Sequence, residues 1–320
     1  MQGQKYAKNI VTETKPFPKE VMERLQARRK ETGSSMESTR LLWLDDEIVK
    51  GAYYMEFLWL WRGSSNGFIE EPHQHDFAEL IGFIGTNQQD PSDLGGEIDI
   101  WLGDERHTLT KSCLVFVPKE LKHCPIQFNR IDKPILWFTA APIGMYKKGS
   151  ITPATNNTNT PAFYPSASQP SVNTATSKYG KYIITQMKSN LSFPRPPRNI
   201  PPDASKMTRI LWLDDEVAKG AFYMECVWFG EGSGAGGPEP HTHDFDEVLG
   251  FIGTNSQEPR DLGAEVELWL DDEKYILRNS CLVFIPRGVK HCPMIFRKVK
   301  KPVFHFSSGN GGMYLKVPSK

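Results

Sequence analysis

The sequence has no run of 18 or more apolar residues, which excludes a membrane-spanning helix of ordinary length. It also has no net charge, because 38 acidic residues balance 38 basic ones. Without an excess of positive charge there is no electrostatic basis for binding nucleic acid or an anionic membrane surface. We therefore expect a small-molecule substrate as the partner, no nucleic acid and no membrane. Association into a homo-oligomer is left open.

Cysteine is scarce, and none of the five cysteines belongs to a Cys-x-x-Cys pair. Residues 1–15 lack the apolar stretch that is typical of a signal peptide. An odd number of cysteines in such a chain favours reduced thiols over a disulfide framework. These features predict a cytoplasmic protein.

A long internal repeat is the strongest feature of the sequence. TRLLWLDDEIVKGAYYMEFLW at 39–59 returns as TRILWLDDEVAKGAFYMECVW at 208–228, and SCLVFVPKELKHCP at 112–125 returns as SCLVFIPRGVKHCP. Fainter similarity links 5–15 to 178–188. The chain of 320 residues is long enough for about two domains. A repeat of roughly 140 residues is far longer than a solenoid unit and predicts two copies of one domain.

The predicted domains are an N-terminal one over 1–148 and a C-terminal one over 178–320. The stretch between them, 149–177, is rich in Ser, Thr, Asn and Pro and has almost no charge. Such a composition buries too little apolar surface to order itself, so we expect a flexible linker. Pro18 and Gly33 frame a short N-terminal helix near 18–32, which has no partner in the second copy.

Elsewhere the pattern is typical of β-strands. Short segments rich in β-branched and aromatic residues are separated by Gly, Pro and Asp, and GEIDIWL at 96–102 alternates apolar and polar positions. About eight such strands per copy predict an all-β jelly roll or small barrel.

Two histidines and a glutamate recur with one spacing, His-x-His-x3-Glu. Because alternate residues of a strand face the same side, the three side chains of each motif can face one centre. Imidazole is the commonest metal ligand in proteins, and a carboxylate adds negative charge. The residues are His73, His75 and Glu79 in the first copy and His241, His243 and Glu247 in the second.

A fourth candidate ligand follows a strand in each copy, at His123 and His291. Six of the eight histidines thus fall in the two constellations at matching positions, whereas His107 and His305 do not recur. That division favours metal ligands over ordinary core histidines.

The two motifs together resemble those of the cupin superfamily, G-x5-H-x-H-x3,4-E-x6-G followed by G-x5-P-x-G-x2-H-x3-N. In the first copy Gly67 precedes the His-x-His-x3-Glu residues at the right distance, and Pro118 and His123 fit the second motif. Gly85 comes one residue early, and Glu120 replaces a glycine of the second motif. The second copy carries the corresponding ligand residues, and the resemblance covers both copies.

This resemblance implies two tandem cupin barrels of the double-stranded β-helix or jelly-roll type, a bicupin. It also implies one divalent transition metal per domain, Fe(II) or Mn(II) being favoured and Ni, Zn or Cu left open. Four protein ligands would leave one or two coordination positions for water, O₂ or substrate.

Two differences between the copies mark candidate catalytic residues. Glu120 stands where the second copy has Gly288, and His305 stands where the first has Trp137. Glu120 could move protons near His123 or be a solvated rim residue. His305 could face the metal or be a hydrogen-bonded core residue.

Three classes of function follow. The first is a non-haem dioxygenase acting on a small organic acid, phenol or diketone, and oxidative chemistry is placed slightly ahead. The second is redox-neutral chemistry at the same centre: a decarboxylase, isomerase or lyase with the metal as Lewis acid. The third is a non-catalytic, ligand-binding bicupin.

Overall fold

The computed structural model describes residues 3–146, 169–191, 204–314 and 317–318. Most of the predicted linker, 149–168, lies outside these residues. The chain divides into two compact units. The first, here called the N-barrel, comprises 15–40 and 55–185. The second, the C-barrel, comprises 1–14, 41–54 and 186–320.

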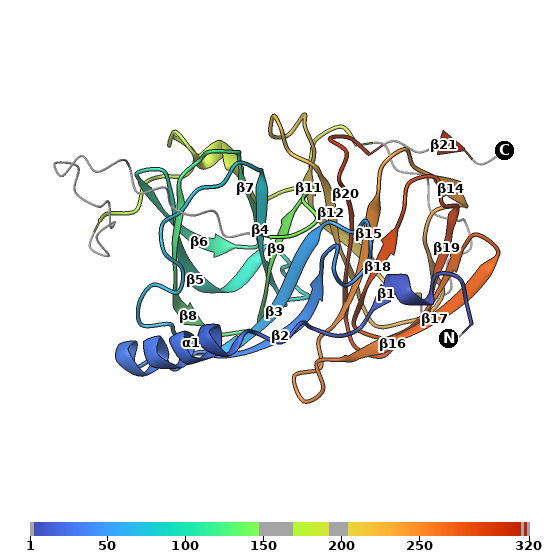
Figure 1. Cartoon of the computed structure of the whole chain (residues 1–320), viewed down its shortest axis with the longest axis horizontal. Helices are drawn as coiled ribbons and strands as arrows, with labels where there is room; N and C mark the ends of the chain where they lie inside the picture. The colour runs from blue at the N-terminus through green and yellow to red at the C-terminus, as the bar shows by residue number, and fades with distance from the viewer. Residues whose placement is uncertain (1–2, 147–168, 192–203, 315–316, 319–320) are drawn as a thin grey trace. The chain divides into compact units, whose positions relative to one another are not determined.

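The N-barrel contains one α-helix, α1 (Lys19–Thr32), as predicted, followed by Gly33 in the left-handed conformation. Its strands form a six-stranded and a three-stranded sheet, β10-β7-β4-β9-β3-β2 and β6-β5-β8 (Figure 1). The strands are β2 (Glu37–Leu44, which continues into the C-barrel segment), β3 (Tyr54–Arg62), β4 (Glu79–Gly85), β5 (Asp93–Leu102), β6 (Glu105–Lys111), β7 (Cys113–Val117), β8 (His123–Ile131), β9 (Ile135–Ala141) and β10 (Ile183–Ile184).

The C-barrel repeats this arrangement with sheets β1-β18-β15-β20-β12-β11 and β17-β16-β19-β14-β21, and β13 pairs with β19. Its strands are β1 (Ile10–Val11), β11 (Met207–Leu213), β12 (Tyr223–Phe229), β13 (Ala235–Gly236), β14 (His241–Thr242), β15 (Glu247–Gly253), β16 (Asp261–Leu270), β17 (Glu273–Asn279), β18 (Cys281–Ile285), β19 (His291–Val299), β20 (Val303–Gly309) and β21 (Val317–Pro318). Short 3-10 helices, Ala7–Asn9 and Gly180–Tyr182, precede β1 and β10. The all-β prediction with tandem jelly-roll domains is confirmed.

The faint similarity between 5–15 and 178–188 marks two equivalent edge strands. β1 pairs antiparallel with β18, Ile10 lying opposite Val283. β10 pairs in the same way with β7, Ile183 lying opposite Val115. Each is the edge strand of a six-stranded sheet and pairs with backbone groups of β18 or β7 that would otherwise remain unpaired. Residues 1–14 therefore group with the C-barrel, and 178–185 group with the N-barrel.

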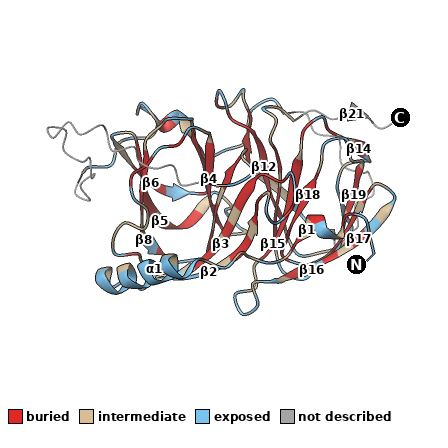
Figure 2. Cartoon of the chain, viewed as in Figure 1, coloured by how far each residue is buried: buried red, intermediate tan, exposed pale blue. Residues whose placement is uncertain are grey.

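Several strands of each barrel are buried on both faces. Strand β4 is buried along its whole length, as are β7, β15 and β18, and Figure 2 shows these strands as continuous buried segments. Ile81 and Phe83 pack with Val115 in one apolar cluster of the N-barrel, and Leu249 and Phe251 belong to the corresponding cluster of the C-barrel. Both clusters continue the inward-facing rows that start at Glu79 and Glu247.

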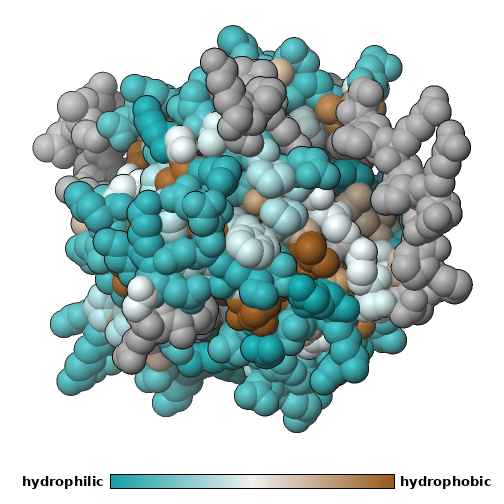
Figure 3. Space-filling model, turned by 90° about the vertical axis from the view of Figure 1, so that its right-hand side faces the viewer, coloured by the Kyte–Doolittle hydropathy of each residue, from teal (hydrophilic) through white to brown (hydrophobic). Residues whose placement is uncertain are grey.

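Hydrophilic side chains cover most of the described surface drawn in Figure 3, and hydrophobic ones form only small separate patches there. Among the residues that the structure describes, no helix is long and apolar enough to cross a membrane.

Candidate metal centres

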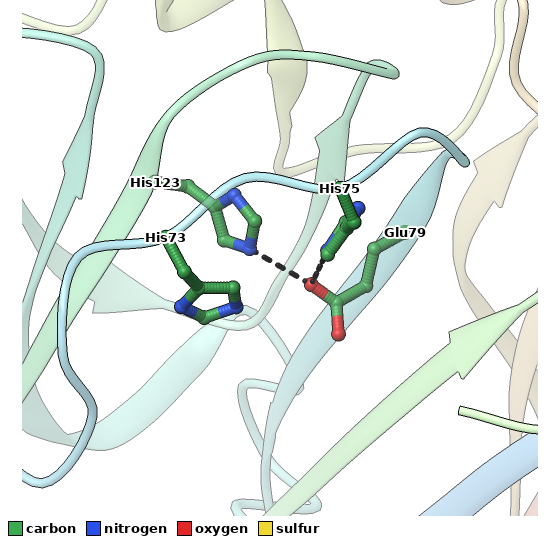
Figure 4. Close-up of side chains that lie close together, drawn as sticks. All are labelled: His73, His75, Glu79 and His123. Carbon is green, nitrogen blue, oxygen red and sulfur yellow. Dashed lines mark hydrogen bonds and ion pairs between the residues drawn. The ribbon is translucent and has the colours of Figure 1, made fainter. Parts of the chain in front are cut away.

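The four predicted ligands of the N-barrel lie together. One potential ligand atom from each of His73, His75, Glu79 and His123 lies within 4.8 Å of the others, and all four residues are buried. Figure 4 shows the side chains turned toward one another. The Glu79 Oε2 atom is 3.2 Å from His75 Nε2 and 3.0 Å from His123 Nε2.

These ligands come from the ends of strands and from the segment before β4. Glu79 begins β4 and His123 begins β8. His73 forms an isolated bridge with His123, in which each amide donates to the other's carbonyl at 3.0 and 2.9 Å. His75 lies outside regular strand structure, so the strand alternation assumed from the sequence is replaced by this bridge and the turn that follows it.

Each imidazole of this cluster is oriented through its Nδ1 atom. Since a carbonyl oxygen can only accept, Nδ1 carries the proton, and a neutral ring directs its Nε2 lone pair away from that bond. Such a bond fixes the ring of a metal-binding histidine. The accepting carbonyls are those of Glu71 for His73 at 2.7 Å, Phe77 for His75 at 2.9 Å and Leu121 for His123 at 2.9 Å.

The electrostatics of the N-barrel cluster suit a cation. Burial opposes ionisation of Glu79, but hydrogen bonds with His123 and His75 outweigh it and lower the pKa of Glu79 to about 2. Burial also opposes charge on His75, yet the bond with Glu79 raises the pKa of His75 overall. Without a cation, two Nε2 lone pairs would face a carboxylate, so protons or a metal must lie between them. Three Nε2 atoms and one carboxylate fit a divalent transition metal.

The C-barrel holds the corresponding residues in a looser cluster. His291 Nε2 is 3.0 Å from Glu247 Oε2, whereas His243 Nε2 is 3.8 Å away. His241 joins His291 and the Cys292 thiol in a second group of potential ligands. Burial opposes ionisation of Glu247, but the close imidazole of His291 outweighs it and lowers the pKa of Glu247. All four predicted ligands are buried.

Sequence reasoning missed a tyrosine beside each cluster. The Tyr146 hydroxyl is 3.5 Å from His73 Nε2, and the Tyr314 hydroxyl is 3.5 Å from His241 Nε2. Both tyrosines end a repeated Gly-Met-Tyr segment, 168 residues apart. Burial raises the pKa of each phenol well above its ordinary value, so both hydroxyls carry their protons. The repeated segment after the last strand was the signal that could have identified them.

Comparison with known proteins was informative only at the level of structure. No family model and no curated protein matches the chain. A structure of Bacillus subtilis oxalate decarboxylase, described with Mn(II) centres, matches with a TM-score of 0.51 and 13% identity, over 88% of this chain and 77% of that one. A mutant of the same enzyme matches with a TM-score of 0.51 and 14% identity, over 89% and 76%. This chain has the fold of a bicupin. At such low identity the likeness establishes the fold and not the activity.

Glu120 lies in a tight turn next to the N-barrel cluster. Its side chain is exposed, and its amide donates to the His75 carbonyl at 2.9 Å. Its φ of 65° lies in the left-handed region, where the C-barrel has Gly288 with a φ of 79° and the same bond to His243. Glycine adopts this conformation without strain, which explains the glycine of the motif. A catalytic role of Glu120 stays a prediction.

His305 lies in the interior of the C-barrel of the bicupin. It faces Phe251 across β15 and β20 and stacks on that ring at 4.8 Å. Its Nδ1–H donates to the Gly250 carbonyl at 2.8 Å. Burial lowers the pKa of His305 to about 4. These contacts describe a neutral core histidine, and its catalytic role also stays a prediction.

We expect His305 to make the stability of the C-barrel depend on pH. The unfolded chain binds a proton at this residue below about pH 6.5, whereas the folded chain does so only near pH 4. The contribution is therefore fully present above pH 6.5, and about 3 kcal/mol is lost as the pH falls to 4. Denaturant unfolding at several pH values should show that the unfolding free energy of His305→Phe falls less steeply than that of the unmodified protein as the pH is lowered. Equal pH slopes for the two proteins would show that His305 does not titrate in this range.

Proposed function

We propose that this bicupin is a metal-dependent enzyme with one divalent transition metal in each barrel, acting on a small carboxylic acid without net oxidation. The observation that carries the proposal is a set of three buried histidines and one buried glutamate at matching positions of each barrel, close together in the N-barrel and looser in the C-barrel. Mn(II) is the ion we favour, because the neighbouring oxalate decarboxylase is described with Mn(II) centres. Decarboxylation is the reaction we favour, and an isomerase or lyase step is the related alternative.

A bound divalent metal would act as a Lewis acid that polarises a carboxylate of the substrate. The residues of the chain supply the rest. The Nδ1 bonds to backbone carbonyls hold the imidazoles in place. Glu79 and Glu247 offset part of the metal's charge, and burial of the ligands limits access of water. The Tyr146 and Tyr314 hydroxyls can donate hydrogen bonds to a group held beside His73 or His241.

The fold comparison favours the redox-neutral alternative over the dioxygenase that the sequence placed first. The two neighbours described above are structures of a decarboxylase. A dioxygenase would consume O₂ with its substrate, whereas decarboxylation releases CO₂ and replaces the lost carboxylate by a proton. The two reactions therefore differ in whether O₂ is consumed and CO₂ is released.

Simultaneous measurement of CO₂ release and O₂ uptake tests the proposal. The Mn(II)-loaded protein should release CO₂ from at least one member of a panel of small carboxylic acids, without O₂ uptake in equal amount. O₂ uptake matched to substrate loss would support the dioxygenase instead. A protein that binds metal and carboxylates without converting them would be the non-catalytic bicupin. The metal-free protein serves as the control.

A further inference from the structure

Each barrel carries a second carboxylate that the metal cluster does not use. Arg40 Nε donates to Glu56 Oε1 at 2.6 Å, and Arg209 Nε donates to Glu225 Oε1 at 2.6 Å. Both glutamates are only half-buried. A carboxylate paired with arginine accepts hydrogen bonds and does not donate them. The duplication therefore gives each barrel one such carboxylate.

In the C-barrel this carboxylate faces the same interior as the metal cluster. Glu225 lies opposite Ser307, and Ser307 lies opposite Leu249. Leu249 is two residues from Glu247 on β15, and residues two apart on a strand face the same side. Glu225, Ser307 and Glu247 therefore share the inward face of one sheet.

Hydroxyl groups link this carboxylate to the metal cluster. The Tyr223 hydroxyl is 3.3 Å from Glu225 Oε2 and 2.9 Å from Ser307 Oγ. The ring of Tyr223 lies 4.6 Å from that of Tyr314, between centroids. The hydroxyl of Tyr314 lies 3.5 Å from His241 Nε2. Tyr223 and Tyr314 thus form a series of contacts that runs from Glu225 to the candidate metal ligand His241.

The N-barrel has the matching groups. Thr139 lies opposite Ile81, which is two residues from Glu79 on β4, so its side chain shares the inward face. Glu56 is four residues from Leu60 on β3, and Leu60 packs in the same apolar cluster as Ile81, so Glu56 lies on the same face of its strand as the residues of that cluster. Glu56, Thr139 and Glu79 therefore share the inward face of the N-barrel sheet, as Glu225, Ser307 and Glu247 do in the C-barrel.

The guanidinium group of Arg40 is held by other contacts. It lies 3.8 Å above the Phe17 ring and donates to the Lys15 carbonyl at 2.6 Å. Arg40 is thus fixed as the partner of Glu56, and a second carboxylate of a substrate would meet Glu56 as a like charge. A hydroxyl can donate to Glu56 and accept from neighbouring hydroxyl groups, whereas a second carboxylate can only accept.

We propose that Glu56 and Glu225 select substrates that carry a hydroxyl group at the end away from the metal-bound carboxylate. The substrate class would then be hydroxylated carboxylic acids rather than dicarboxylates. This inference rests on the proposed function, because it assumes that a carboxylate binds at the metal.

Three acids that share one metal-binding end test the inference by isothermal titration of the Mn(II)-loaded protein. Lactate, glycerate and tartronate all present an α-hydroxy carboxylate, followed by a methyl, a hydroxymethyl and a carboxylate group. We expect glycerate to bind about tenfold or more tightly than lactate, since a hydrogen bond to a charged group contributes that much. Tartronate should bind more weakly than glycerate by at least the same factor. Tartronate binding as tightly as glycerate would overturn the inference.

The double variant Glu56→Gln with Glu225→Gln should reduce the preference for glycerate over tartronate by about tenfold, because it removes both negative charges. Glu265→Gln is the matched control, because it also breaks a Glu–Arg pair, in which Arg278 Nη2 lies 2.7 Å from Glu265 Oε2. Glu265 lies on β16, whereas Glu225 lies on β12. The order of the three affinities is measured on the unmodified protein, so it does not depend on whether the double variant folds. Binding of none of the acids, or equal binding without Mn(II), would overturn the proposed function and this inference together. Binding that needs Mn(II) but shows no glycerate preference would overturn the inference alone.

Discussion

Glutamine in place of both Glu79 and Glu247 is expected to abolish most metal binding and to lower turnover by about 10³-fold or more. The substitution keeps the size of the side chain but removes its charge, which leaves a divalent cation among neutral ligands in a buried site. Loss of a metal's contribution to a transition state amounts to several kcal/mol, and each 1.4 kcal/mol is a factor of ten. Metal content and CO₂ release should be measured on the same preparations.

The single variants show which barrel performs the reaction. Glu79→Gln should empty the N-barrel centre and leave the C-barrel centre loaded, and Glu247→Gln should do the reverse. Glu265→Gln again serves as the control for a lost surface charge. Full metal content and full turnover in the double variant would contradict the assigned ligands.

Tyr6→Ala is expected to lower the free energy of unfolding of the C-barrel by about 3–5 kcal/mol, the usual cost of removing a large buried aromatic side chain. Tyr6 is only 7% exposed and belongs to the core of the C-barrel, although it lies close to the start of the chain. Its amide donates to the Tyr275 hydroxyl at 2.9 Å, and its own hydroxyl donates to Asp271 at 2.5 Å. Hydrogen exchange of β18 during denaturation would report on the C-barrel specifically.

Lys8→Ala is the matched control, since Lys8 is exposed in the same segment. It should change the unfolding free energy by less than about 0.5 kcal/mol. If Tyr6→Ala left the protection of β18 unchanged, the pairing of β1 with β18 would not contribute to the stability of the C-barrel.

Most of the fold and the ligand set could be predicted because they depend on local patterns that occur twice. Alternating strands, turn residues and the spacing of His73, His75 and Glu79 are all local properties, and duplication distinguished the six recurring histidines from the two that do not recur. His123 was found by the same comparison. The structure brings these four side chains together as expected.

The features that the sequence did not reveal depend on contacts between distant segments. Tyr146 follows the last strand of its barrel, where no periodic pattern indicates direction. Glu56 lies in a strand rich in aromatic residues, and the sequence pattern around it does not indicate that its side chain faces inward. The attachment of residues 1–14 to β18 depends on edge pairing with a segment far along the chain, Ile10 lying opposite Val283, which a faint similarity alone could not place.

Glu120 shows what the second motif requires of the main chain. The glycine of the second motif suggested that a glutamate there had a special role. The structure shows that the position needs a left-handed backbone and an amide directed at the His75 carbonyl. Those requirements concern the main chain, and a catalytic role of the exposed side chain stays a prediction.

Elemental analysis of the purified, unmodified protein would show whether each barrel binds a metal. We expect two divalent transition-metal ions per chain, reduced to one by His73→Ala and to one by His241→Ala. Protein that takes up no transition metal under Mn(II)- or Fe(II)-replete conditions would contradict this expectation.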